Sequence, residues 1–438
     1  MNKKLSKIIF LKLLFICFVA TSQTILTIDE AIKNGLEKNY NVLIQKNVNE
    51  ISKLQNNYGN AGMSPTVSLN ANIALSNLNS YQEFSTGTIQ QKNGAQSHNI
   101  GASINAGWVI FDGLKMFTIK KRLTENEKLS ELNLKQQMEN TIFDIISLYY
   151  NVVKLNQLIK ASKQNIEIYD ERKKIAQLKY EIGSDSKVDL MLAQSNLNKA
   201  KSSLIQLEIQ LLNAKTDLNT LMFKPIDNDF ITSDTLLINY NPDINELKTE
   251  AIKNNSSLLI SKQLESISFL NFRESKSNNL PIVQLNGSYN FIQNQSQAGF
   301  VFLNKQSGVN VGLTAGWLIF NGTKNSKLSK ERNIVYLNQK YASDFIQQKV
   351  DAQVFNNYKN FVLNKSIVVL ETQNLTDAKE LITISIERYK LGKANFLETI
   401  ETQKNLEDAQ IRYVDALYAM KIAEAELLRS NGKLIKQN

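Results

Sequence analysis

The sequence predicts an α+β membrane protein in which one structural unit occurs twice: a helix, a β-hairpin and a long coiled-coil hairpin. The first observation is a near-repetition, because "AGWVIFDG" at residues 106–113 returns as "AGWLIFNG" at 315–322. The second is a set of segments in which apolar and polar residues alternate, as they do in half-exposed strands. The third is a pair of long stretches without Gly or Pro that carry heptad repeats. These features together indicate a duplicated chain.

The amino terminus has the three parts of a secretory signal peptide. Three lysines precede an apolar run that ends near Val19, and small residues follow up to Ser22, so we expect residues 1–22 to be removed. The run is too short to span ~30 Å of hydrocarbon. The single cysteine, Cys17, lies inside this segment, so the mature chain has no disulfide and no thiol nucleophile. The remaining charge contains no arginine-rich run of the kind that favours nucleic acid.

The repetition continues along the chain. "YEIG" at 180–183 is matched by "YKLG" at 389–392, and "EAIKN" at 30–34 recurs at 250–254. A period of about 200 residues is too long for a solenoid of short repeats. We therefore expect a signal peptide at 1–22, a first repeat at 23–222, a linker at 223–242 that packs around the middle of the molecule, and a second repeat at 243–438.

Each repeat opens with a helix whose start carries a capping pattern. Thr27 and Asp243 can serve as N-caps, and a glutamate follows each of them three residues later, which is the spacing of a capping box. The first of these helices is expected to cover 28–59, with a kink near Gly35 and Asn39.

The second part of each repeat is a pair of strands with one apolar and one polar face. Val67 and Leu69, for example, flank Ser68. A soluble sandwich would show the same period of two. Here the polar face is rich in Asn, Ser and Gln, and the loops at 78–98 and 293–307 are long and polar, which favours a transmembrane β-barrel with water inside. The expected strands are about 65–76, 99–111, 281–292 and 308–320.

Trp108 and Trp317 occupy matching positions near the ends of two of these strands. Such residues suit an aromatic girdle at the membrane interface. They also suit ordinary packing, and the sequence leaves both interpretations open.

The third part is a long helix and its return. Residues 114–180 and 323–391 contain neither Gly nor Pro, and a helix of that length would measure ~100 Å. In the return segment, 187–222, leucine recurs every seven residues, which predicts coiled-coil packing. This return helix is only about half as long as its partner, so we expect the opening helix to stack on its end. The coiled-coil hairpins then cover 114–222 and 323–430.

Four strands per chain cannot close a barrel, since about eight are needed, so several copies must combine. At this point the sequence resembles the TolC-like outer membrane efflux proteins over essentially the whole mature chain. The resemblance rests on the order of the elements, on the family phrase "LFDG", here "VIFDG" and "LIFNG", and on a tip motif, here "YEIGSDSKVDLMLAQ". It implies a homotrimer with a twelve-stranded β-barrel in outer membrane lipid that continues into a twelve-helix α-barrel in the periplasm.

The resemblance also implies a function. Such proteins are exit ducts for small molecules or secreted polypeptides. They work with a periplasmic adaptor, also called a membrane fusion protein, and with an inner membrane efflux transporter or ABC exporter. The family needs no cofactor and no metal, and nothing in the sequence names the cargo.

The resemblance gives a role to the repeated phrase and to the hairpin tips. The phrase marks the place where a strand becomes a tunnel helix, with Asp112 or Asn321 as the cap and Gly113 or Gly322 easing the turn. The tips are either adaptor-docking surfaces or ordinary helix turns with a left-handed glycine. The tip residues expected to contact the adaptor are Gly183, Ser184, Gly392 and Lys393.

Glu398 and Glu401 follow the second tip and, being three residues apart, share one face of a helix. Charged pairs of this kind usually form a solvated face. By resemblance to the family, however, they match the acidic ring of the narrow periplasmic entrance.

Asp189 lies at the matching place in the first hairpin and is expected to pair with Tyr389 or Lys393, which would form the gate network. One departure from the family affects this gate. The position two residues after the second tip glycine, where the family archetype has a basic residue, is Ala394.

Other classes of function fit less well. An enzyme is not expected, because no nucleophile has a partner, no phosphate-binding loop occurs, and the single histidine, His98, lies in a polar stretch at a strand edge. A periplasmic coiled-coil adaptor would share the long hairpins and the signal peptide, but it would lack two pairs of Asn-rich alternating strands. A plain porin would have no use for the heptads.

Overall fold

The structure is a computed structural model, and it describes residues 25–233 and 240–435. The signal peptide expected at 1–22 lies outside the described residues. None of the helices in the described ranges is both long and apolar enough to cross a membrane.

The chain divides into two compact units, and each unit combines segments from both halves of the sequence. Unit 1 consists of residues 1–44, 135–255 and 349–438, and unit 2 consists of residues 45–134 and 256–348. The duplicated halves are therefore interleaved within each unit.

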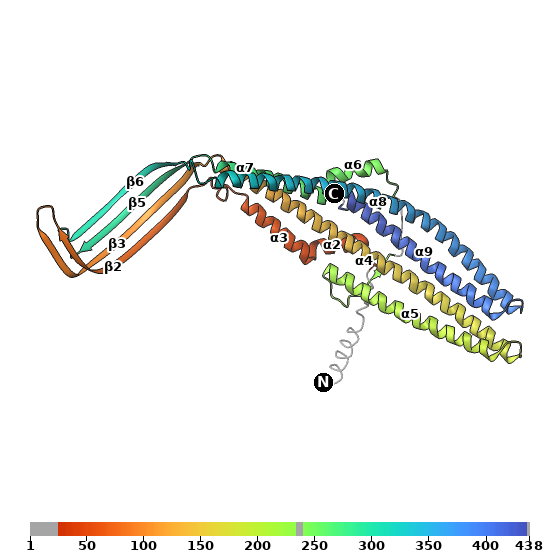
Figure 1. Ribbon diagram of the computed structural model, residues 1–438. Coiled ribbons are helices and arrows are strands. Elements are labelled where there is room, and N and C mark those ends of the chain that lie inside the picture. The colour runs from red at the N-terminus through yellow and green to blue at the C-terminus, as the bar shows by residue number, and fades with distance from the viewer. Residues whose placement is uncertain (1–24, 234–239, 436–438) are drawn as a thin grey trace, which may run out of the picture. The chain divides into compact units, whose positions relative to one another are not determined.

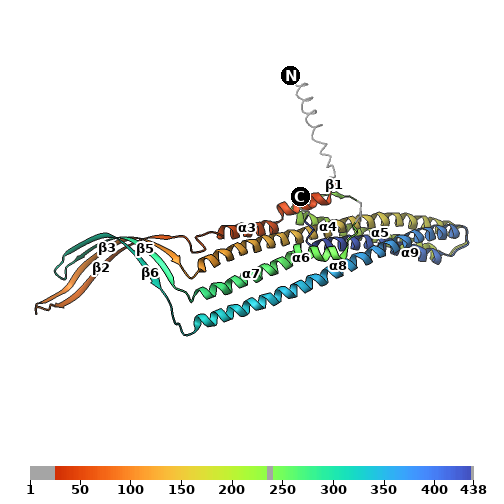
Figure 2. The ribbon, with the colours of Figure 1, turned by 90° about the horizontal axis from the view of Figure 1, so that it is seen from above.

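Unit 2 contains one antiparallel sheet in the order β2-β3-β5-β6. Its strands are β2 (Thr66–Glu83), β3 (Ile89–Phe111), β5 (Ile282–Ser296) and β6 (Leu303–Gly316). The four strands lie side by side in Figure 1 and again in the turned view of Figure 2. Because β3 pairs with β5, backbone hydrogen bonds join the hairpin of the first half to that of the second half.

The first hairpin is longer than the sequence predicts. Its strands continue through most of 78–98, where we expected a loop, and cross one irregularity between Leu78 and Ser80. The ladder is made by backbone groups, so polar side chains can continue it after the apolar alternation has ended.

The last strand lies earlier in the sequence than predicted, because β6 covers Leu303–Gly316 and the expected range was about 308–320. β6 ends at Gly316, whereas we expected strand to residue 320. Gly316 pairs with Ile282, which is the first residue of β5, so residues 317–320 lie beyond the end of the strand that would pair with them.

One face of the sheet is apolar and uncovered within the described chain. Val67 and Leu69 on β2 are 70% and 72% exposed, and Val311 on β6 is 74% exposed. Polar side chains on the opposite face bond to one another, as where Asn286 Nδ2 donates to Thr314 Oγ1 at 3.1 Å. This is the separation of faces that the alternating sequence predicts.

The two tryptophans are held in the same way. Trp108 Nε1 donates to the Met63 carbonyl at 2.9 Å, and Trp317 Nε1 donates to the Asn279 carbonyl at 3.1 Å. Each acceptor lies just before the first strand of its own hairpin. Both rings are also exposed, so each tryptophan is fixed by a bond, and the girdle remains a prediction.

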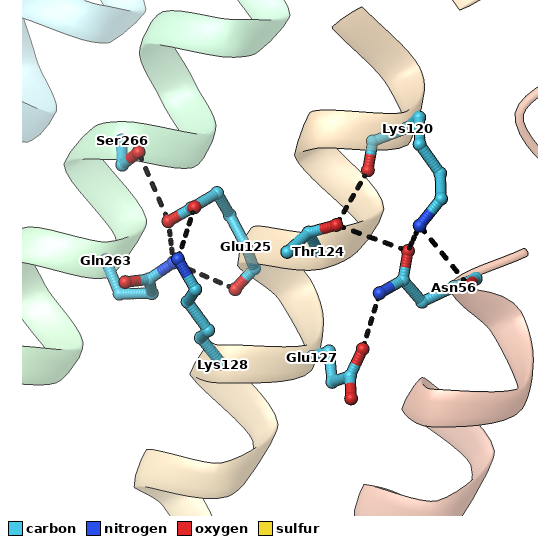
Figure 3. Close-up of polar contacts among 8 residues, drawn as sticks. All are labelled: Asn56, Lys120, Thr124, Glu125, Glu127, Lys128, Gln263 and Ser266. Carbon is cyan, nitrogen blue, oxygen red and sulfur yellow. Dashed lines mark hydrogen bonds and ion pairs between the residues drawn. The ribbon is translucent and has the colours of Figure 1, made fainter. Parts of the chain in front are cut away.

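The long helices of unit 2 are joined by polar contacts on both sides of α4 (Figure 3). The helices are α3 (Tyr40–Gln55), α4 (Lys115–Glu181), α7 (Ser256–Ser277) and α8 (Lys324–Lys390). Beside α3, Lys120 Nζ donates to Asn56 Oδ1, and Asn56 Nδ2 donates to Glu127, both at 2.5 Å. Toward α7, Gln263 Nε2 donates to the Glu125 carboxylate. At the α7–α8 contact of the second half, Phe269 instead packs on Tyr336 with ring centroids 5.3 Å apart.

Unit 1 holds the coiled-coil ends of the long helices and the linker. Its other elements are α2 (Ile28–Lys38), α5 (Lys187–Met222), α6 (Ile244–Asn254), α9 (Phe396–Ser430) and the short parallel pair β1 (Ile25–Leu26) and β4 (Ile231–Thr232). A buried core that includes Ile145, Leu218 and Phe230 ties α4, α5 and the linker together.

An asparagine interrupts the opening helix of each half and binds the end of the return helix. Asn39 separates α2 from α3, and its Nδ2 donates to the Leu221 carbonyl of α5 at 3.3 Å. Asn255 separates α6 from α7, and its Nδ2 donates to the Ser430 carbonyl of α9 at 2.8 Å. The opening and return helices therefore meet at their ends. The last carbonyls of a helix lack partners inside the helix, which explains why an amide donor is found there.

Both halves pass from strand to helix through the same turn. Gly113 and Leu114 have φ angles of +73° and +66°, and Gly322 and Thr323 have +67° and +69°. Glycine removes the steric cost of the first of these left-handed positions.

A side chain then caps each long helix. The Asp112 carboxylate accepts from the Met116 amide at 2.9 Å, and Asn321 Oδ1 accepts from the Asn325 amide at 3.4 Å. These four turn residues (Asp112, Gly113, Asn321 and Gly322) thus lie at the strand-to-helix transitions.

The two turn glycines differ in how much space surrounds them, which gives a matched test. A Cβ at position 113 would lie 2.7 Å from Leu280 Cβ and 2.8 Å from the Ser277 carbonyl, whereas a Cβ at position 322 would meet nothing within 4 Å. Gly322→Ala should cost only the left-handed strain, roughly 1–2 kcal/mol. Gly113→Ala should cost about 1–3 kcal/mol more from overpacking.

Thermal unfolding of the two variants in detergent, followed by circular dichroism, checks this expectation. The melting temperature of Gly113→Ala should fall further than that of Gly322→Ala. Equal losses would show that the close contacts at position 113 carry no cost.

Candidate functional site

The two helix–helix turns in unit 1 have the same backbone design. Gly183 follows α4 and Gly392 follows α8, with φ angles of +76° and +71°. In the first turn the amides of Gly183 and Ser184 donate back to the carbonyls of Tyr180 and Lys179 at 3.0 and 2.8 Å, which is a Schellman motif. The second turn repeats these bonds at equivalent positions. The tip residues predicted from the sequence, Gly183, Ser184, Gly392 and Lys393, all lie in these turns and are exposed.

The helices that leave the turns are capped by different residues. Ser186 caps α5, and Asp189 completes a capping box by accepting from the Ser186 amide and hydroxyl at 3.3 and 2.8 Å. Asn395 caps α9 by accepting from the Glu398 amide at 2.8 Å. The Asp189 carboxylate is therefore engaged at the start of its own helix.

Within the described chain the Asp189 carboxylate bonds to Ser186, and its charge helps to raise the pKa of the Tyr389 phenol, so the predicted pairing of Asp189 with Tyr389 or Lys393 stays a prediction. Tyr389 is 1% exposed, and its hydroxyl donates to Asp185 Oδ2 at 2.6 Å. Lys179 approaches from the same side, 3.9 Å from Asp185 Oδ1 and 4.1 Å from the Tyr389 ring centre. The carboxylate that bonds to Tyr389 within this chain is therefore Asp185, four residues before Asp189.

Burial raises the pKa of the Tyr389 phenol, and the neighbouring Asp185 carboxylate raises it further. The phenol therefore stays protonated at neutral pH and continues to donate its hydrogen bond. This bond connects α8 of the second hairpin to the turn of the first hairpin.

Asp185 was missed in the sequence, although a signal for it was present. It stands two residues after Gly183, just as Ala394 stands two residues after Gly392. The family resemblance points to a gate side chain only at the second of these equivalent positions, Ala394.

The acidic pair lies at the start of α9. Glu398 Oε1 is 3.5 Å from Arg388 Nε, and both side chains are partly exposed. Arg388 Nη2 also donates to the Lys393 carbonyl at 3.3 Å. Glu401 is exposed one turn further on. An exposed pair of this kind adds little stability, so its significance lies in charge and position.

Beneath the turns, the ends of four helices meet in one buried cluster. Ala176 of α4, Ala193 of α5, Tyr389 of α8 and Phe396 of α9 are each at most 4% exposed. The two hairpin tips are therefore packed together. In the described ranges, no three His, Cys, Asp or Glu residues are placed to hold a metal ion.

The family of the chain follows from comparison with known proteins. A family model described as "Outer membrane efflux protein" matches residues 51–222 and 247–433. The chain belongs to the outer membrane efflux protein family. Family membership places the protein in the outer membrane, and it disfavours the alternative of a periplasmic adaptor.

One relative in sequence and several solved structures are similar to this chain. The outer membrane efflux protein BepC of Brucella suis biovar 1 (strain 1330) is 18% identical over 335 residues, which are 76% of this chain and 72% of that protein. VceC of Vibrio cholerae superposes with a TM-score of 0.79 at 12% identity, over 92% of this chain and 96% of that one. The CmeC channel of Campylobacter jejuni superposes with a TM-score of 0.77 at 15% identity, over 94% of this chain and 86% of that one.

Of these proteins, CmeC is an outer membrane channel. At such low identity the structural likeness establishes the fold only. The helix-rich chain with one four-stranded sheet is thus the TolC-like fold that the sequence predicts.

Proposed function

We propose that three copies of this chain form an exit duct that crosses the outer membrane and extends into the periplasm. The observation that carries the proposal is the sheet of unit 2. Its apolar face is uncovered, and β2 and β6 are each paired on one side only. Open sheet edges are not viable in hydrocarbon. Three copies joined edge to edge would give twelve strands, enough to close a barrel.

Exposed apolar residues on the helices of unit 2 support the same assembly. Val48 and Ile51 on α3 are 43% and 53% exposed, and Ile334, Tyr341 and Phe345 on α8 are 58–66% exposed. The three residues on α8 are spaced seven and four apart, so they form one stripe. Packing between copies would bury both surfaces.

The function is tested by measuring the mass of the detergent-extracted protein and its conductance in a planar bilayer. We expect a trimer with discrete conductance steps. Changing both Tyr341 and Phe345 to Glu should abolish the trimer, because two carboxylates per copy would enter an apolar contact. Lys340→Glu, at an exposed neighbouring position, should leave it intact. A monodisperse soluble monomer would contradict the proposal and would favour a periplasmic adaptor instead.

The Tyr389–Asp185 bond acts as the latch of the periplasmic entrance, with Lys179 supporting the carboxylate. It takes the place of the gate network expected from Asp189, Tyr389 and Lys393. The support for this role is that the bond joins the two hairpins at their tips.

Tyr389→Phe removes the latch bond without changing the ring. A hydrogen bond to a charged group contributes about 1.5–3 kcal/mol, so the open probability of single channels should rise about tenfold or more. Asp185→Asn should act in the same direction. Asp189→Asn should have a smaller effect, since that side chain caps its own helix. A larger rise in open probability for Asp189→Asn than for Asp185→Asn would refute Asp185 as the partner of Tyr389 in the gate.

Glu398 and Glu401 form the acidic ring of the entrance, so a trimer would hold six carboxylates around one opening. Carboxylates gathered around one opening attract cations. The channel should therefore prefer cations and be blocked by multivalent cations.

Changing both residues to Gln should remove cation selectivity and weaken block by a trivalent cation about tenfold, which corresponds to roughly 1.4 kcal/mol. The matched control is the pair Glu208→Gln and Asp217→Asn on α5, which also removes two exposed carboxylates per copy. Reversal potentials and block constants measure both effects. Unchanged values in the first variant would place Glu398 and Glu401 on the outer wall.

The hairpin tips dock the periplasmic adaptor, which links the duct to an inner membrane efflux transporter or ABC exporter. Support comes from the exposed tip residues, which no other part of the described chain covers. A photo-crosslinking residue at Ser184 or Lys393 should capture the adaptor in cells. The same residue at Ser366, exposed on α8, should not. Equal capture from all three positions would argue against tip docking.

A further inference from the structure

Arg172 is the most buried charged side chain near the entrance. It lies on α4, is 1% exposed, and donates from Nη1 to the Thr399 carbonyl of α9 at 3.1 Å. Its guanidinium lies over the rings of Tyr169 and Phe396, 5.3 and 5.1 Å from their centroids. The guanidinium therefore contacts α9 through one carbonyl oxygen and one aromatic ring.

The remaining donors of this guanidinium are unused. Nε and Nη2 have no hydrogen-bond partner in the described chain. Burial lowers the pKa of Arg172, while nearby Tyr169, Tyr389 and Glu407 raise it. A buried charge that is incompletely compensated destabilises a fold, whereas an apolar side chain of similar volume would often be neutral or better. The contact is therefore costly as a means of packing alone.

Arg172 belongs to a polar seam between α4 and α9. Asn165 Nδ2 donates to Gln410 Oε1 at 2.7 Å, and Gln403 Nε2 donates to Asn165 Oδ1 at 3.4 Å, all between buried side chains. Leu406 of α9 lies beside this seam in an apolar cluster. Buried polar groups in a coiled coil specify register more than they add stability.

The carbonyl held by Arg172 has a specific place in α9. Thr399 directly follows Glu398 and precedes Glu401 by two residues. The bond therefore fixes the helical turn that carries both carboxylates. We infer that Arg172 is a positioning residue that holds this turn of α9 against α4, so that Glu398 and Glu401 keep the arrangement needed to bind cations.

This inference rests on the entrance proposed above, since it explains how the acidic pair is held. Groups fixed in advance bind more tightly than the same groups on a mobile turn. Loss of Arg172 should weaken cation block even though both carboxylates remain. A general loss of packing at the same interface should lower stability without that effect.

The test compares four variants of the full-length protein in planar bilayers, with a trivalent lanthanide ion as the probe. Arg172→Met should weaken the block about tenfold, and Arg172→Lys should restore most of it, because an ammonium group can also bind a carbonyl and an aromatic face. Leu406→Ala, which opens a cavity beside the same seam, should lower the melting temperature and leave the block unchanged. Arg412→Met removes an exposed arginine of α9 that pairs with Glu371, and it should change neither property.

The outcomes separate this inference from the proposed entrance. If the wild-type channel conducts but Glu398→Gln with Glu401→Gln leaves the block unchanged, the entrance proposal fails. The role of Arg172 is refuted if those carboxylates are needed for the block but the Arg172→Met channel is blocked as strongly as wild type. It is also refuted if Leu406→Ala weakens the block as much as Arg172→Met does. If Arg172→Met does not assemble, Arg172→Leu decides the question. That change also removes every donor to the Thr399 carbonyl, and an unchanged block would overturn the inference.

Discussion

Backbone hydrogen bonding at the two free edges of the sheet is the constraint on which the rest of this structure depends. β2 and β6 each have one unpaired edge, and an unsatisfied peptide group in hydrocarbon costs several kcal/mol. In the trimer proposed above, neighbouring copies would supply the missing backbone partners at both edges. Lipid would cover the apolar face of the sheet, and the exposed stripe of α8 would pack against another copy.

The two halves share the same backbone conformation at their turns but differ in the side chains that make contacts there. Both strand-to-helix turns are left-handed at Gly113 and Gly322, yet only the first is crowded. One contact between the opening helix and the long helix is a hydrogen bond from Lys120 to Asn56, whereas a contact in the second half is aromatic, between Phe269 and Tyr336. The two repeats thus differ from each other at contacts made by side chains, whereas the backbone turns are the same in both.

Much of the fold could be predicted from the sequence, because the repeat and the heptads are physical patterns. The long helices were recognisable from the absence of Gly and Pro, and the sheet from its alternation. The ends of the strands were not, because polar residues continue the first hairpin where apolar alternation stops. In the site, the glycine turns were predictable from composition. Asp185 had a signal in its position two residues after Gly183, but its bond to Tyr389, 204 residues away, was not predictable. Arg172 gave no signal, because its contact joins α4 to α9, which lie far apart in the sequence.

The asparagine joints determine where the chain can change in length. One residue inserted into an unbroken helix rotates everything beyond it by about 100°, so the heptads of α4 leave no tolerance for it. The end of α5 and the start of α3 are held together by two contacts: the hydrogen bond from the Asn39 amide to α5, and the packing of Tyr40 on Phe223 with ring centroids 4.1 Å apart. Residues added to the connecting segment after Phe223 rotate neither helix. Insertions and deletions among relatives should therefore occur mainly in the segment after Phe223, while the continuous helices keep a fixed length.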